Sequence, residues 1–274
     1  MGKLVEKLRQ VGQGNGGGVG FLGPRQQAQA PRPAAVLVTV GAGDAQAAAS
    51  AAKNGADVVV VGGWQPGTDV SAIASAASGE KAVWGVELAA EGRYSDGTLK
   101  RAQEAGASFA LVGQSSPAGV LFEELDGFDL LVQVEVPQDD LALALLRAEN
   151  LLPAQVALLN ARLSSADLAR MTVADFARLR LACESLRFPV VLGLAEAPED
   201  AQVKTLVRLG VSGLALRGAG VAAETLGAQV KALREQLEKT PAKPEDRGGP
   251  VAIGGLMEAS GQSLRRQEPE PDEE

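Results

Sequence analysis

A few polar side chains that could do chemistry stand at the ends of short apolar runs in this sequence. They include two carboxylates, Glu87 and Glu135, together with the amide of Asn160 and the guanidinium of Arg217. Two carboxylates and an amide are suitable oxygen ligands for Mg²⁺ or Mn²⁺, and a carboxylate can also act as a general base. A guanidinium can hold a carboxylate or phosphate group through two parallel hydrogen bonds. We therefore consider Glu87 and Glu135 as catalytic or metal-binding residues, and Asn160 and Arg217 as substrate-binding residues.

The elements that must position these side chains form one repeated pattern, in which a short apolar run is followed by a turn and an amphipathic helical stretch. The eight apolar runs are 36–42, 57–63, 82–88, 109–113, 130–136, 155–161, 189–195 and 213–217. Strands that alternate with helices indicate βαβ units and a parallel sheet. Eight units in roughly two hundred residues predict an α/β fold, a closed (β/α)₈ barrel, whose site lies at the mouth formed by the C-terminal ends of the strands.

The alternation of side chains along a strand predicts which residues face the inside of this barrel. In the run 130–136 three valines share one face, and Gln133 and Glu135 share the other. The valine face should meet the helices, so Gln133 and Glu135 should point inward. The same argument turns Glu87 and Arg217 inward, and adds Gln133 to the candidate substrate-binding residues.

Two interpretations of this cluster remain open from the sequence. In the first, the carboxylates hold a metal ion or act as a base while Arg217 binds an anionic substrate group. In the second, Arg217 neutralises one or both of Glu87 and Glu135 in a buried ion network that only stabilises the lumen. Arg162 and Glu196 are expected just beyond this mouth.

The composition excludes several kinds of chemistry. The chain has no histidine, which rules out Ser-His-Asp and Cys-His nucleophiles and histidine-ligated zinc or haem. Acid–base chemistry must then use carboxylates, lysine, Tyr94 or a metal-bound water. The single cysteine, Cys183, lies in a helical run, where we expect a buried packing role.

Charge and hydropathy bear on partners and location. The formal net charge is −8, and the tail from residue 240 onward carries much of it. No basic stripe suggests nucleic acid, whose phosphates require clustered lysine and arginine. No stretch has the length of a membrane span, and the N-terminus lacks the apolar region of a signal peptide, so we expect a cytoplasmic protein.

Three segments are expected along the chain. Residues 1–33 form an N-terminal helix with a Gly- and Pro-rich extension, 34–239 form the barrel, and 240–274 form an acidic, disordered tail with a short apolar patch at 251–257. The N-terminal helix has Leu4, Leu8 and Val11 on one face. This face and the apolar patch are candidate contacts for self-association or for a protein partner.

The segment 209–222, which reads LGVSGLALRGAGVA, resembles the last strand and turn of phosphate- and flavin-binding barrels. More generally the chain resembles the (β/α)₈ TIM-barrel superfamily, without pointing to one family. The resemblance implies that the backbone of Gly218 and Gly220 binds a phosphate group, either of a small metabolite or, less favoured, of FMN. Where such barrels usually have a Gly-Gly turn after the seventh strand, this chain has Glu196.

Two functions from different classes follow. The first is a barrel that binds a small carboxylate or phosphate metabolite at its mouth, with lyase or isomerase chemistry carried by carboxylates, with or without Mg²⁺. The alternative is a non-catalytic barrel that acts as a binding or scaffold module through its terminal extensions.

Overall fold

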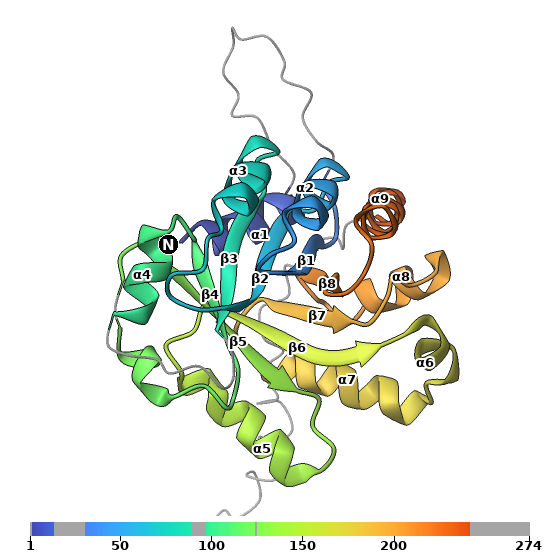
Figure 1. The fold of residues 1–274 in the computed structure, drawn as a ribbon. Coiled ribbons are helices and arrows are strands. Elements are labelled where there is room, and N and C mark those ends of the chain that lie inside the picture. Colours follow the sequence, from blue (N-terminus) through green and yellow to red (C-terminus); the bar gives the residue numbers. More distant parts are fainter. Residues whose placement is uncertain (1, 14–30, 89–96, 124, 242–274) are drawn as a thin grey trace, which may run out of the picture. The chain divides into compact units, whose positions relative to one another are not determined.

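The computed structural model describes residues 2–13, 31–88, 97–123 and 125–241, all within a compact unit that spans Met1–Ala242. Among these residues eight parallel strands pair in chain order, and the last pairs with the first to close a barrel (Figure 1). The strands are β1 (Ala35–Gly41), β2 (Val58–Trp64), β3 (Val83–Leu88), β4 (Phe109–Val112), β5 (Asp129–Glu135), β6 (Val156–Leu163), β7 (Val190–Leu194) and β8 (Gly213–Arg217). The predicted closed barrel is confirmed, and the largest difference in strand bounds is two residues, at the end of β6.

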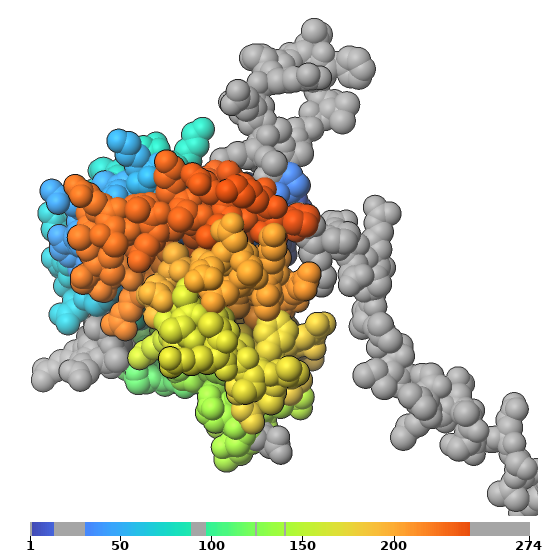
Figure 2. Space-filling model, turned by 90° about the vertical axis from the view of Figure 1, so that its right-hand side faces the viewer, coloured from blue at the N-terminus to red at the C-terminus, as the bar shows by residue number. Residues whose placement is uncertain are grey.

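Helices lie outside the strands and alternate with them along the chain (Figure 1). They are α2 (Ala45–Lys53), α3 (Ser71–Gly79), α4 (Thr98–Glu104), α5 (Asp140–Ala148), α6 (Ser165–Arg170), α7 (Val173–Ser185), α8 (Asp200–Val207) and α9 (Ala223–Lys239), with short 3₁₀ turns η1 (Ala118–Phe122) and η2 (Glu149–Leu151). Polar caps begin several of them. Thr172 and Asp175, for example, form a reciprocal capping box at the start of α7. Figure 2 shows α9, in orange-red, lying beside α8 on the outer surface.

The apolar side chains form two layers because alternate strand residues face opposite sides. Val132 and Val134 are buried between the strands and the helices, as the alternation predicts. The inward-facing residues near the N-terminal ends of the strands, here called the lower end of the barrel, form a separate core inside the lumen. Leu131 and Phe109 are two of them. Phe109 occupies the space left by Gly85, since a Cβ atom on Gly85 would lie 2.6 Å from the Phe109 ring.

The N-terminal helix α1 (Lys3–Gln13) covers the lower end of this lumen. Leu4, Leu8 and Val11 are buried against the inner core residues of the strands. The face that the sequence offers to a partner is therefore occupied by the chain's own barrel, because an amphipathic stripe can be covered within the chain as well as by a second molecule. The other expected contact, the apolar patch at 251–257, lies outside the described residues.

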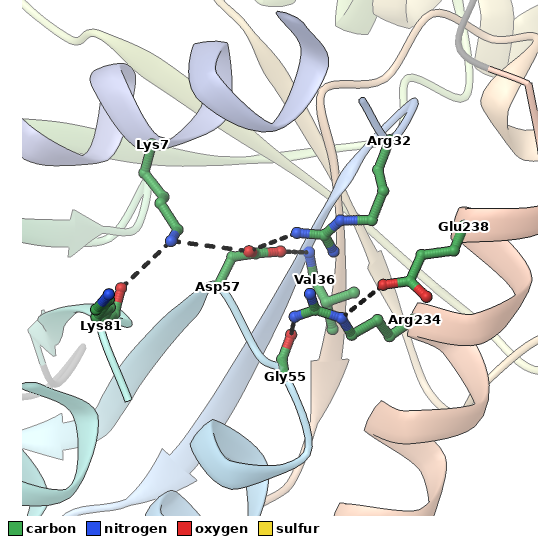
Figure 3. A network of polar contacts seen from close by, with 8 residues as sticks. All are labelled: Lys7, Arg32, Val36, Gly55, Asp57, Lys81, Arg234 and Glu238. Carbon is green, nitrogen blue, oxygen red and sulfur yellow. Dashed lines mark hydrogen bonds and ion pairs between the residues drawn. The ribbon is translucent and has the colours of Figure 1, made fainter. Parts of the chain in front are cut away.

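A polar network fastens this lower end (Figure 3). The Asp57 carboxylate accepts hydrogen bonds from Arg32 Nη2 at 2.7 Å and from the Val36 backbone N–H at 2.9 Å. Lys7 Nζ of α1 lies 3.9 Å from Asp57 Oδ1 and donates to the Lys81 carbonyl at 3.3 Å. Both Arg32 and Asp57 are buried, so this pair ties the segment before β1 to the start of β2. With α1 over the lower end, a site is expected at the opposite end of the strands.

In the described part of the chain, no helix combines the length and the apolar character needed to cross a membrane.

Candidate active site at the barrel mouth

A cavity of about 600 Å³ opens at the C-terminal ends of the strands. Its walls combine polar side chains from several strands with small and apolar residues. They are Thr39, Gly41, Gly62, Gly63, Glu87, Leu111, Gln133, Leu158, Asn160, Arg162, Gly193, Leu194, Ala195, Ala215, Leu216, Arg217, Ala219 and Val221. The structure thus brings together Glu87, Gln133, Asn160 and Arg217 from the predicted set, and Glu135 does not line the cavity.

Glycine at upper lumen positions keeps the cavity open. Gly41, Gly62 and Gly193 face inward on β1, β2 and β7, in the layer where other strands carry polar side chains. A Cβ atom at Gly62 would lie 3.1 Å from Glu87 Oε2, tight enough to force a shift. The absence of a side chain at position 62 therefore gives the Glu87 carboxylate its room.

Glu87 is the half-buried carboxylate of the cavity. Its removal from water raises its pKa above the ordinary value of 4.5, while the positive charges of Arg217 and Arg162 act in the opposite direction. A carboxylate with a raised pKa is better matched to proton transfer near neutral pH than a fully solvated one.

Arg217 ends β8 and is exposed at the mouth. In the part of the chain that the structure describes, no ion pair within 4.0 Å and no hydrogen bond joins its guanidinium to a carboxylate. Glu135 is exposed as well. Neither Arg217 nor Glu135 is removed from water, so the structure shows no buried ion pair between these two residues, and a stabilising role of Arg217 toward the half-buried Glu87 stays a prediction.

Arg162 lines the cavity from β6 instead of lying beyond it. The pairing of β6 with β7 shifts between Asn160 and Leu163, and Arg162 sits in this irregularity with φ at +48°, in the left-handed region. Its Nε donates to Asn160 Oδ1 at 3.2 Å. Arg162 shares the inward side of β6 with Leu158 and Asn160, as alternation along the strand requires, but the predicted strand ended at residue 161 and so left Arg162 beyond the mouth.

Within the described residues, Glu135 reaches the site through its neighbour Asn160. It pairs in register with Asn160 on the adjacent strand, and its Oε1 accepts a hydrogen bond from Asn160 Nδ2 at 2.8 Å. Among the described residues no group of three or more acidic or cysteine side chains is arranged to hold a metal ion. Glu87 is the carboxylate that reaches the cavity, so a metal site shared by Glu87 and Glu135 stays a prediction.

Comparisons with known proteins address the fold. No protein-family model matches the sequence, and no curated protein matches it either. Among solved structures, thiamine phosphate pyrophosphorylase from Pyrococcus furiosus superposes with a TM-score of 0.55 and 15% identity, covering 76% of this chain and 96% of that one. A 3-hexulose-6-phosphate synthase gives 0.51 and 18%, covering 74% and 99%. Phosphoribosylanthranilate isomerase from Thermotoga maritima gives 0.53 and 11%, covering 74% and 98%.

The chain is a TIM barrel. At these identities the likeness concerns the fold alone, and no family is shown. The eight strands and their pairing order lead to the same assignment independently. In a TIM barrel the C-terminal face carries the site, which is the face where the cavity opens.

The resemblance to phosphate-binding TIM barrels implied that the backbone of Gly218 and Gly220 binds a phosphate group. The turn after β8 differs from this expectation at Gly218. The Gly218 N–H is already bonded to the Thr39 carbonyl at 2.7 Å, and a Cβ at Gly218 would lie 2.6 Å from Leu226 of α9. Gly218 therefore serves barrel closure and close helix packing, and its N–H is not free for a phosphate. Gly220 is exposed with φ at +80°, and the neighbouring Ala219 and Val221 line the cavity instead.

Two further residues were placed by the structure. Glu196 does not line the cavity, because its Oε1 accepts the Ser165 backbone N–H at 2.9 Å at the start of α6. Cys183 is buried in α7, as expected, and burial raises the pKa of its thiol to about 11. Tyr94 lies outside the described residues.

Proposed function

We propose that this TIM barrel binds a small anionic metabolite at its mouth, with Arg217 and Arg162 holding the anionic group. The observation that carries the proposal is the pair of guanidiniums that line one cavity, both exposed and neither joined to a carboxylate within 4.0 Å in the described part of the chain. A guanidinium without a carboxylate partner keeps its hydrogen-bond donors available for a ligand.

The charge and size of the cavity support this proposal. The charged side chains of the described lining are Arg162, Arg217 and Glu87, so the lining carries one more positive than negative charge. A volume of about 600 Å³ lies within the range of small-molecule sites. The structural neighbours include proteins named for phosphorylated compounds, a thiamine phosphate pyrophosphorylase and a 3-hexulose-6-phosphate synthase, which agrees with an anionic ligand.

Glu87 is the residue that we assign to proton transfer. It is half-buried in the same cavity, and desolvation favours its protonated form more than in water. A carboxyl group near an arginine-bound anion suits removal or delivery of a proton at a carbon next to a carbonyl, which is lyase or isomerase chemistry. The described lining offers Glu87 as its carboxylate ligand for Mg²⁺, with Asn160 and Gln133 as neutral oxygen donors, so Mg²⁺ serves as one arm of the test.

The binding test uses inorganic phosphate and malonate as probes at low ionic strength, with melting temperature and calorimetry as readouts. A ligand that binds the native state stabilises it by mass action. We expect a saturable stabilisation of the wild-type chain, and a loss of affinity of roughly tenfold or more in Arg217→Leu and Arg162→Leu.

The matched control is Arg208→Leu, which removes an exposed arginine that does not line the cavity. It should bind both probes like the wild type. Equal responses of all three variants would contradict the proposal, as would a wild-type chain that responds to neither probe.

The catalytic part is tested separately with Glu87→Gln. This variant should keep its anion affinity and lose incorporation of deuterium from D₂O at the carbon beside the carbonyl of small keto acids and phosphorylated ketoses. Measurements with and without Mg²⁺ show whether exchange needs the metal. Deuterium incorporation that is unchanged in Glu87→Gln would exclude Glu87 as the proton-transfer group.

A further inference from the structure

We propose that Glu135 is a positioning residue of the anion site, which acts through Asn160 to orient the guanidinium of Arg162. This inference rests on the proposed function, because it explains how one of the two arginines is held toward the ligand. Glu135 itself does not line the cavity.

The first observation is the backbone of Arg162. Its φ of +48° lies in the left-handed region, which non-glycine residues avoid unless their surroundings hold them there. The shift in β6–β7 pairing between Asn160 and Leu163 places Arg162 in this conformation. Val156, Leu158 and Asn160 face the lumen, and Arg162, two residues further along β6, lies on the same side and lines the cavity in spite of the irregular pairing.

The second observation is a chain of two hydrogen bonds that uses both ends of one amide. Asn160 Nδ2 donates to Glu135 Oε1 at 2.8 Å, and Asn160 Oδ1 accepts from Arg162 Nε at 3.2 Å. A carboxylate can only accept, so it fixes the Nδ2 end of the amide toward Glu135. The Oδ1 end must then face Arg162, where it binds Nε and leaves the outer guanidinium nitrogens for a ligand.

Removal of Glu135 frees the amide to rotate. A flipped Asn160 would present its NH₂ group to the Arg162 guanidinium, and two donors that face each other cannot bond. The guanidinium would then lose its fixed direction while the rest of the cavity keeps its walls. The expected result is a weaker anion site in a folded protein, since Glu135 is exposed and its loss leaves no buried group unsatisfied.

The sign of the effect separates this role from simple electrostatics. Glu135 carries a negative charge at the rim, so its removal on charge grounds alone would strengthen anion binding. A positioning role predicts the opposite for Glu135→Ala, a weakening of phosphate affinity of about three- to tenfold by calorimetry. Glu135→Gln keeps an acceptor oxygen for Asn160 and removes the charge, and it should bind phosphate as well as the wild type or better.

A double-mutant cycle assigns the effect to Arg162. In the Arg162→Leu background, Glu135→Ala should produce no further loss of phosphate affinity. Glu196→Ala is the matched control, because Glu196 is a second carboxylate outside the cavity lining. Unlike Glu135, it accepts a backbone N–H, that of Ser165. It should leave the affinity unchanged or slightly stronger.

A second readout does not depend on anion binding. The Nε–H resonance of Arg162, assigned by its loss in Arg162→Lys, should be protected from water exchange in the wild type and in Glu135→Gln, and lose protection in Glu135→Ala. Tighter or unchanged phosphate binding in Glu135→Ala, a loss that persists without Arg162, or a protected Nε–H in Glu135→Ala would each overturn the inference. A wild-type chain that binds no phosphate would contradict the proposed function, and the resonance would still decide the role of Glu135.

Discussion

The Asp129 carboxylate accepts the backbone N–H of Leu4 at 2.9 Å, which joins the first strand residue of β5 to the first turn of α1, 125 residues earlier in the chain. The same oxygen accepts the Val5 N–H at 3.2 Å. These N–H groups have no partner within the helix. A negative charge near the N-terminus of a helix also interacts favourably with the helix dipole. Asp129 therefore caps α1 from inside the barrel floor.

Asp129→Ala should destabilise the chain by about 1–3 kcal/mol, because two buried N–H groups lose their acceptor. Urea denaturation followed by circular dichroism measures this loss. The control is Asp69→Ala, which removes a carboxylate that accepts the Ser71 N–H at an exposed position and should cost less. Phosphate affinity should not change in Asp129→Ala, since the mouth is at the other end of the barrel; a parallel loss of affinity would show that the two ends are coupled.

Arg32→Leu should cost much more stability than Arg217→Leu. The Arg32 guanidinium bonds Asp57 at 2.7 Å with both side chains 4% exposed, so its loss leaves a buried carboxylate without its partner and should cost about 3–5 kcal/mol. Arg217 is exposed, and its loss should cost about 1 kcal/mol or less. Denaturant midpoints for both variants test this contrast. A large loss for Arg217→Leu would support the ion-network interpretation.

Glu87→Gln should change the pH dependence of stability. Burial raises the pKa of Glu87 in the folded state. Just above pH 4.5 the folded chain therefore binds more protons than the unfolded chain. As the pH rises through that range, the contribution of Glu87 to the free energy of unfolding falls. The variant should therefore melt at or above the wild-type temperature at pH 7. The difference should disappear toward about pH 4, where both states are protonated. A variant that is less stable at pH 7 and not at low pH would contradict the sign of this pKa shift.

Gly85→Ala should destabilise the barrel, because the new methyl group would overlap the Phe109 ring and its backbone carbonyl oxygen. Overpacking of this kind costs about 1–3 kcal/mol. Gly41→Ala is the matched control: Gly41 is also in a strand, and a Cβ there would meet no atom within 4 Å. Thermal denaturation of both variants is the measurement, and equal stability would mean that Phe109 can move aside.

Cys183 should be inert in the native protein. Its thiol is buried in α7 and its pKa is raised to about 11, so almost no thiolate forms at neutral pH. Labelling with iodoacetamide at pH 7.5 should be slow in buffer and complete in urea. Rapid labelling of the folded chain would indicate local opening of α7.

The sequence was sufficient for the barrel and for most of the inward-facing layer. A strand has a two-residue period and a βαβ unit has a local signature, so Gln133 could be assigned to the lumen and Val132 to the helix side without any long-range information. The absence of histidine likewise limited the chemistry before any fold was known. These properties belong to single residues or to neighbours along the chain.

Tertiary structure decided the rest. Arg162 lines the cavity because β6 continues to Leu163, beyond its predicted end. Gly218 loses its free N–H because the carbonyl of Thr39, in a strand far earlier in the chain, accepts it. The sequence of α1 has the same apolar face whether the chain's own barrel or a partner covers it. Only the packed structure shows that the barrel covers it. Burial, strand register and hydrogen-bond partners depend on contacts between segments that are distant in the sequence. A local sequence pattern therefore does not determine them.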